Sequence, residues 1–164
     1  GRATHYSVSR AFFQFDVSGI THIPKSGRIS IFGFTNTACD MSLIKTNQTS
    51  LLGSGDFDAI EGWVAGEDNT SNVTFYNLSP ITTWVTTANN IHLSQQALVD
   101  IAGLSTLKCC LMDSNHDIRD IAPTAPSGPT NYSGLYYADS LGTSRDPFLN
   151  ITEQDDSVFF GANF

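Results

Sequence analysis

The sequence predicts an all-β protein, an antiparallel β-sandwich or jelly roll with one or two short helices. Two observations support this prediction. Apolar and polar residues alternate in several short runs, which is the pattern of half-buried strands. Turn-forming residues separate these runs at short intervals, as they do in sandwiches and jelly rolls. The chain has 164 residues, enough to bury a sizeable core, so we expect residues 1–164 to form a single β-sandwich domain.

The two opening strands are the clearest. Ser9–Ile20 reads SRAFFQFDVSGI and Arg28–Phe34 reads RISIFGF. Alternate residues of the first run are apolar, which places them on one face of a sheet. Phe12 interrupts the alternation, so we expect it to cover an edge or to meet a partner.

Further strands are expected around Met41 and Leu43, Val73 and Phe75, Ile91 and Leu93, Leu107 to Leu111, Leu135 and Tyr137, and Leu149 and Ile151. A helix is predicted over Ser94–Ile101, with Ser94 as its N-cap and Gly103 as its stop signal. A single short turn of helix is expected within Ser54–Trp63. Both helical segments are too short to be stable alone and must pack on the sheets.

Charge and hydropathy exclude two classes of partner. The net charge is −8 and the eight basic residues are scattered, whereas nucleic-acid binding needs clustered Lys and Arg. No run of about 18 apolar residues is present, so membrane insertion is not expected. Only 15% of residues are charged, and the polar surface must come from Ser, Thr and Asn. Such a neutral, hydroxyl-rich surface suits a β protein that is exposed outside the cell.

The three cysteines, Cys39, Cys109 and Cys110, give no even disulfide set. Adjacent residues in a strand point to opposite faces, so either Cys109 or Cys110 remains a possible partner of Cys39. The alternative, which we favour, is three reduced and mostly buried thiols. No paired-ligand spacing for zinc is present.

One acidic segment resembles the start of a calcium loop. Asp113, Asn115 and Asp117 alternate as oxygen donors, with Asp120 following. Ile118 stands where an EF-hand needs Gly, which excludes that motif. Either a sandwich-type calcium site or a solvated acidic turn remains, so the expected cofactor is none or calcium.

Catalysis has weak support. The pairs Asp113 with Asp117 and Asp56 with Asp58 are the only candidate acid–base carboxylates that we single out. No nucleophile, metalloprotease or phosphate-loop motif is present. The chain is therefore not expected to be an enzyme.

Aromatic residues suggest a sugar contact. Residues 122–132 (APTAPSGPTNY) form a Pro-rich polar loop, and such loops often carry recognition. Tyr132, with Asn131 and Tyr136, is the candidate sugar-contacting group, because aromatic faces bind apolar sugar faces. Trp63 and Trp84 are expected in the core instead.

Residues 153–164 are expected to form an extension of the sandwich. An acidic spacer precedes an apolar segment that reads VFFGANF over Val158–Phe164. Exposed apolar patches usually mark interfaces. We expect Val158, Phe159, Phe160 and Phe164 to mediate self-association by docking on a neighbouring copy.

Together these runs resemble DNRLRE-type β-sandwich domains from about Arg10 to Thr152. The resemblance rests on the two opening strands, Asp56–Trp63, Ile81–Trp84, Asn90–Ile101, Leu135–Asp139 and Gly142–Pro147. It implies a fold like that of carbohydrate-binding modules, found in secreted and cell-surface proteins and, in close variants, in phage virion proteins. It supplies no catalytic residues. The strand that usually opens the family would precede Ser9, and its absence predicts an open sheet edge.

The function expected from these observations is a non-catalytic structural or adhesion module on a virion or cell surface. Its partners would be other copies of itself or a coat or surface protein, with glycan as an additional ligand. The alternative is a dedicated carbohydrate-binding module, and a third reading is a glycan-cleaving enzyme.

Overall fold

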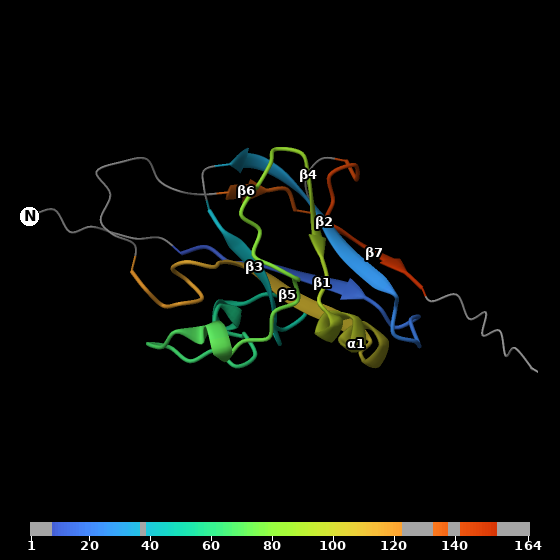
Figure 1. Cartoon of the computed structure of the whole chain (residues 1–164), viewed down its shortest axis with the longest axis horizontal. Coiled ribbons are helices and arrows are strands. Elements are labelled where there is room, and N and C mark those ends of the chain that lie inside the picture. Colours follow the sequence, from blue (N-terminus) through green and yellow to red (C-terminus); the bar gives the residue numbers. More distant parts are fainter. Residues whose placement is uncertain (1–7, 37–38, 123–132, 138–141, 154–164) are drawn as a thin grey trace, which may run out of the picture.

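The structure is a computed structural model that describes residues 8–36, 39–122, 133–137 and 142–153. Two antiparallel sheets pack face to face, with one short helix at the end of the stack (Figure 1). The predicted all-β sandwich is therefore confirmed. No helix among these residues is long and apolar enough to cross a membrane.

The first sheet has three strands in the order β1-β5-β3. They are β1 (Ala11–Asp16), β5 (Thr106–Asp113) and β3 (Met41–Lys45). β5 lies in the centre, and Phe13 and Ala11 of β1 lie opposite Cys109 and Leu111. The alternation that predicted β1 places Ala11 and Phe13 in the core between the sheets.

The second sheet is built around the long strand β2 (Ser26–Asn36). β4 (Ala88–His92) pairs with one edge of β2, and β7 (Phe148–Thr152) and β6 (Ser133–Leu135) pair with β2 as well. Gly33 allows a close approach at this sheet, because a Cβ there would lie 2.2 Å from the Val85 carbonyl oxygen and 2.5 Å from Trp84 Nε1.

The predicted helix is α1 (Gln95–Gly103). Ser94 caps it as expected, with its Oγ accepting a hydrogen bond from the Ala97 amide at 3.3 Å. Leu98 and Ile101 are buried and join the core between the sheets. The helix packs at one end of the sandwich (Figure 1).

The first sheet is covered on both faces. Ile44, Cys110 and Met112 point away from the sandwich core and pack with Ile60, Val73 and Ile118 in a second apolar cluster. Residues 46–81 supply most of this cover, which includes the short 3-10 helices η1 (Ser54–Asp56) and η2 (Asn69–Ser71). We call residues 46–81 the outer cover. Phe12 packs against this second cluster, which explains its break in the alternation.

Two local predictions need correction. The segment around Val73 and Phe75 is not a strand; it lies against β3 and makes a single bridge from Phe75 to Ile44. Its backbone hydrogen-bonds to the edge of β3, from the Lys45 amide to the Thr74 carbonyl at 2.9 Å and from the Tyr76 amide to the Leu43 carbonyl at 2.8 Å, but the pairing does not extend into a ladder. The side chains of Val73 and Phe75 join the second cluster. Tyr137 lies beyond β6, which is only three residues long.

All three cysteines are free. Cys109 lies in the core between the sheets and Cys110 in the second cluster, on opposite faces of β5 as predicted. The thiol of Cys39 donates a hydrogen bond to Asp113 at 3.2 Å.

Candidate protein-contact surface

Arg10 fixes the outer cover to the first sheet. Its side chain is only 2% exposed, and its guanidinium lies 4.2 Å from the centre of the Phe57 ring and 4.5 Å from that of Trp63. Two hydrogen bonds, at 2.9 and 2.7 Å, join it to the Asp117 carboxylate. Two parallel hydrogen bonds of this kind strengthen an ion pair and also fix the relative orientation of its two side chains.

Two more acceptors complete the shell of Arg10. The guanidinium donates to Asp58 Oδ1 at 2.8 Å and to the Phe57 carbonyl at 2.7 Å. Burial alone would lower the pKa of Arg10, but the hydrogen bonds and charges of Asp117 and Asp58 outweigh it and raise the pKa. One side chain immediately before β1 therefore holds together three segments that are distant in sequence.

Asp56 organises the neighbouring loop. Its carboxylate accepts hydrogen bonds from the Gly53 amide at 2.8 Å, the Thr49 amide at 2.8 Å and the Thr49 hydroxyl at 2.7 Å. These hydrogen bonds, led by that of Gly53, lower the pKa of Asp56 below its ordinary value. The loop carrying Leu51 and Leu52 thus has a defined shape.

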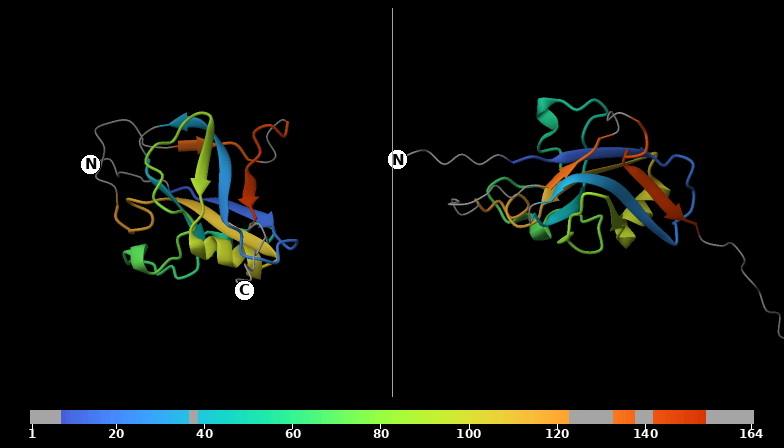
Figure 2. Two further views of the ribbon diagram at one scale, coloured as in Figure 1. Left: turned by 45° about the vertical axis from the view of Figure 1, so that its right-hand side comes forward. Right: turned by 90° about the horizontal axis from the view of Figure 1, so that it is seen from above.

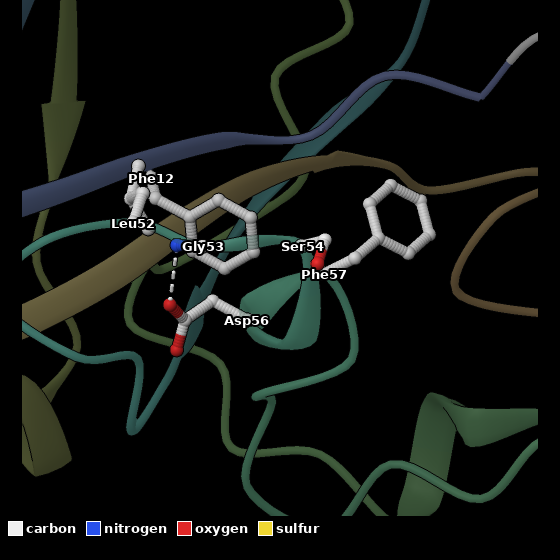
Figure 3. Close-up of a pocket in the computed structure, with 6 residues that line it drawn as sticks. All are labelled: Phe12, Leu52, Gly53, Ser54, Asp56 and Phe57. Atoms are coloured by element: carbon white, nitrogen blue, oxygen red, sulfur yellow. Dashed lines mark hydrogen bonds between the residues drawn. The ribbon is translucent and has the colours of Figure 1, made fainter.

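An apolar pocket opens where this loop meets β1. It has a volume of about 430 Å³ and is lined by Phe12, Leu52, Gly53, Ser54, Asp56 and Phe57. The rings of Phe12 and Phe57 lie on either side of η1, and the only polar contact drawn is the Asp56 bond to Gly53 (Figure 3). The surface of the pocket is mostly carbon, so the pocket suits an apolar side chain.

Exposed leucines extend this apolar area. Leu51 is 89% exposed and Leu52 58% exposed, although both belong to a structured loop. Phe57 and Val64 also remain exposed on the outer cover. We call Phe12, Leu51, Leu52 and Phe57 the outer apolar patch.

The predicted calcium donors are engaged with protein groups. Asp113 Oδ1 accepts from the amides of Asn115 and His116, and Asp117 binds Arg10. The side-chain Nδ2 of Asn115 donates to Asp40, while Asp120 accepts from the backbone amide of Gly66. Within the described ranges no group of three or more His, Cys, Asp or Glu side chains is placed to hold a metal. The structure gives no support to the calcium site, which stays a prediction.

The candidate acid–base pairs are likewise used in structure. Asp56 shapes its loop and Asp58 binds Arg10, while Asp113 and Asp117 bind the donors described above.

A second hollow, of about 330 Å³, is lined by Lys45, Lys108 and Tyr76 among others. Lys45 there forms ion pairs with Glu61 and Asp100.

Tyr136 lies in a small aromatic cluster. Its ring meets that of Phe34 edge-on at 5.4 Å, and the guanidinium of Arg145 lies 4.6 Å from its centre. Phe34 is 50% exposed.

The two tryptophans were both expected in the core. Trp84 is buried and donates to the Gly134 carbonyl at 3.1 Å, whereas Trp63 is only partly buried beside Arg10.

The remaining predicted site residues lie outside the described residues. They are Asn131, Tyr132, Val158, Phe159, Phe160 and Phe164. The sequence reasoning did not single out Arg10, Leu52 or Phe57. An adjacent Leu51-Leu52 pair in an otherwise polar loop was the available signal for the patch.

Comparisons of the chain with family models, curated proteins and solved structures found no match. The resemblance to DNRLRE-type domains therefore stays a prediction.

Proposed function

We propose that this chain is a non-catalytic structural or adhesion module that works through protein–protein contacts on a virion or cell surface. The observation that carries the proposal is the outer apolar patch beside its pocket. Leu51 and Leu52 are held in the open by a loop that Asp56 and Arg10 tie down. Ordered apolar side chains kept in water indicate a surface that is covered by a partner.

The pocket indicates which side chains the partner would present to the patch. The lining of the pocket beside Phe12 is mostly apolar, and interface cores are rich in aromatic residues that fill such pockets. The partner would thus be another copy of this chain or a coat or surface protein that presents an aromatic or large aliphatic side chain.

The carboxylates support a non-catalytic role. Asp56, Asp58 and Asp117 each accept hydrogen bonds from protein donors in the surroundings of the patch. A general acid or base must instead reach a substrate proton.

A substitution at the patch tests the proposal. Leu52→Asp puts a charge into the pocket wall without filling space in the core, because Leu52 is exposed. Leu78→Asp is the matched control, since Leu78 is 69% exposed and lies outside the patch. Sedimentation of the full chain at rising concentration should show assembly that Leu52→Asp abolishes and Leu78→Asp leaves intact. Equal behaviour of both variants and the parent would contradict a role for the patch in self-contact.

Carbohydrate binding is the second candidate function, favoured by the Phe34–Tyr136–Arg145 cluster. The half-exposed ring of Phe34 offers stacking, and the Arg145 guanidinium over the neighbouring Tyr136 ring offers hydrogen bonds to the same sugar. Titration calorimetry with a panel of neutral and acidic oligosaccharides should detect binding that Phe34→Ala removes. Leu104→Ala, at an exposed apolar position, is the control. Heat of binding that survives Phe34→Ala would place the sugar elsewhere.

A further inference from the structure

Within the described part of the chain, β1 has one open edge. It pairs with β5 on one side, and among the described residues no strand pairs with its other side. The outermost strand of a sheet presents unpaired N–H and C=O groups that can accept another strand. This edge runs directly beside the outer apolar patch, because Phe12 belongs to both.

The register shows which backbone groups face outward. The Val17 amide donates to the Ser105 carbonyl at 3.0 Å, which continues the ladder of Phe13 with Cys109 and Phe15 with Leu107. In an antiparallel pair, alternate residues point their backbone groups toward the partner. The N–H and C=O groups of Phe12, Gln14 and Asp16 therefore point away from β5.

Apolar side chains flank the open edge on both faces. Phe12 is partly exposed on the outer face, next to the pocket. Phe15 is partly exposed on the inner face, where Tyr137 also stacks on Phe13 with ring centres 6.4 Å apart. A strand added here would be flanked by apolar groups on both faces, and strands buried on both faces read as continuous apolar runs.

We propose that this edge binds the segment Val158–Phe164 of a second copy of the chain as an added strand, with one of its phenylalanines in the pocket beside Phe12. The segment begins with three consecutive apolar residues, Val-Phe-Phe, which supply side chains to both faces at once. Strand addition combines backbone hydrogen bonds for affinity with pockets for alternate side chains. The inference rests on the proposed protein-contact function and names the partner.

Strand direction favours the second copy over the same chain. β7 and β1 run toward the same end of the sandwich (Figures 1 and 2), and Thr152 at the end of β7 lies opposite Ser26. The chain would have to reverse after Thr152 to lie beside its own β1. Three carboxylates in Glu153–Asp156 oppose a tight reversal, because charged spacers repel themselves and extend. A twofold axis instead presents the β1 edge of a second copy in the opposite direction, so that two segments exchange reciprocally.

A proline at the edge tests the proposal with little change to the sandwich. Gln14→Pro removes one outward N–H, and proline is tolerated in edge strands where its nitrogen faces solvent. Gln14→Ala is the matched control, because it loses the same side chain, including its 3.4 Å contact to the Ser50 carbonyl, but keeps the N–H. Light scattering should show dimers for the parent and Gln14→Ala. It should show a twofold lower mass for Gln14→Pro and for the chain lacking Val158–Phe164.

Mixing the two monomeric variants gives the sharper result. The Gln14→Pro variant keeps the segment Val158–Phe164, and the variant that lacks this segment (the deleted chain) keeps an intact β1 edge. The two variants should therefore form a one-to-one heterodimer. If Gln14→Pro fails to fold, a labelled Ser157–Phe164 peptide added to the deleted chain replaces it and should bind, with Phe159→Ser and Phe160→Ser together abolishing binding.

Three outcomes would overturn the proposal. A parent chain that is monomeric at high concentration, while its deleted form binds the peptide, would show that the segment occupies its own edge. A peptide that does not bind the deleted chain would exclude this edge altogether. Dimers that survive Gln14→Pro but are lost with Leu52→Asp would leave the protein-contact function standing and remove strand addition alone.

Discussion

Arg10 and Asp117 lie 107 positions apart in sequence and share two hydrogen bonds, at 2.9 and 2.7 Å, beneath the rings of Phe57 and Trp63. Their side chains are almost wholly buried. The pair joins the first strand of the sheet to the turn after β5, and Phe57 and Asp58 bring in the outer cover.

Removing one member of this pair should destabilise the protein strongly. Asp117→Ala leaves a buried guanidinium with fewer partners, and breaking a buried pair costs about 3–5 kcal/mol. Urea denaturation followed by tryptophan fluorescence would measure the loss. The double variant Arg10→Met with Asp117→Leu should recover part of it, since an apolar replacement leaves no unpaired charge; equal losses in single and double variants would argue against the pair.

Gly33→Ala should also destabilise the sandwich. The new Cβ would overlap the Val85 carbonyl and the Trp84 indole, which are fixed by hydrogen bonds to Asn89 and Gly134. Overpacking of this kind costs about 1–3 kcal/mol. Gly103→Ala is the control, because nothing lies within 4 Å of its added Cβ. A thermal melt that separates the two variants by several degrees is expected, and similar melting temperatures would show that Val85 moves freely.

Acid should weaken the loop that Asp56 organises. The folded-state pKa of Asp56 is lowered, so its contribution to stability is fully present above the unfolded value of about 3.9 and is lost as pH falls through the folded value. Asp56→Asn should lower the melting temperature by a constant amount near neutral pH, and the gap to the parent should close below about pH 4. A gap for Asp56→Asn that stays open at pH 2 would contradict the linkage.

Calcium is expected to leave stability unchanged. The oxygens of Asp113, Asp117 and Asp120 already accept hydrogen bonds from protein donors, whereas calcium needs six or more converging oxygens. Melting curves in excess calcium and in chelator should superimpose. A higher melting temperature in calcium, lost in Asp120→Asn, would support the predicted site, because a ligand that binds only the folded state stabilises it.

Local patterns were enough to predict most of the strands and the helix. β1 and β5 follow from alternation, and α1 follows from the Ser94 cap and the apolar residues behind it. These signals are carried by neighbours in the sequence, so no tertiary information is needed to detect them.

The contact surface could not be predicted in the same way. Arg10 is an ordinary polar residue of an alternating strand until Asp117 and Phe57 arrive from distant segments. Val73 and Phe75 alternate like a strand, yet their segment meets the edge of β3 through only one isolated bridge, and their side chains join the second cluster. The position of each residue in the tertiary structure decides its role, and the local sequence pattern does not contain that information.

β5 gives the molecule two built-in reporters. Cys109 and Cys110 are successive residues, but one thiol belongs to the core between the sheets and the other to the apolar cluster beneath the outer cover. Proteins open in cooperative units of unequal stability. If the outer cover detaches first, Cys110 becomes reactive while Cys109 remains protected. The reaction rates of the two adjacent thiols would then report separately on the opening of the outer cover and of the sandwich core.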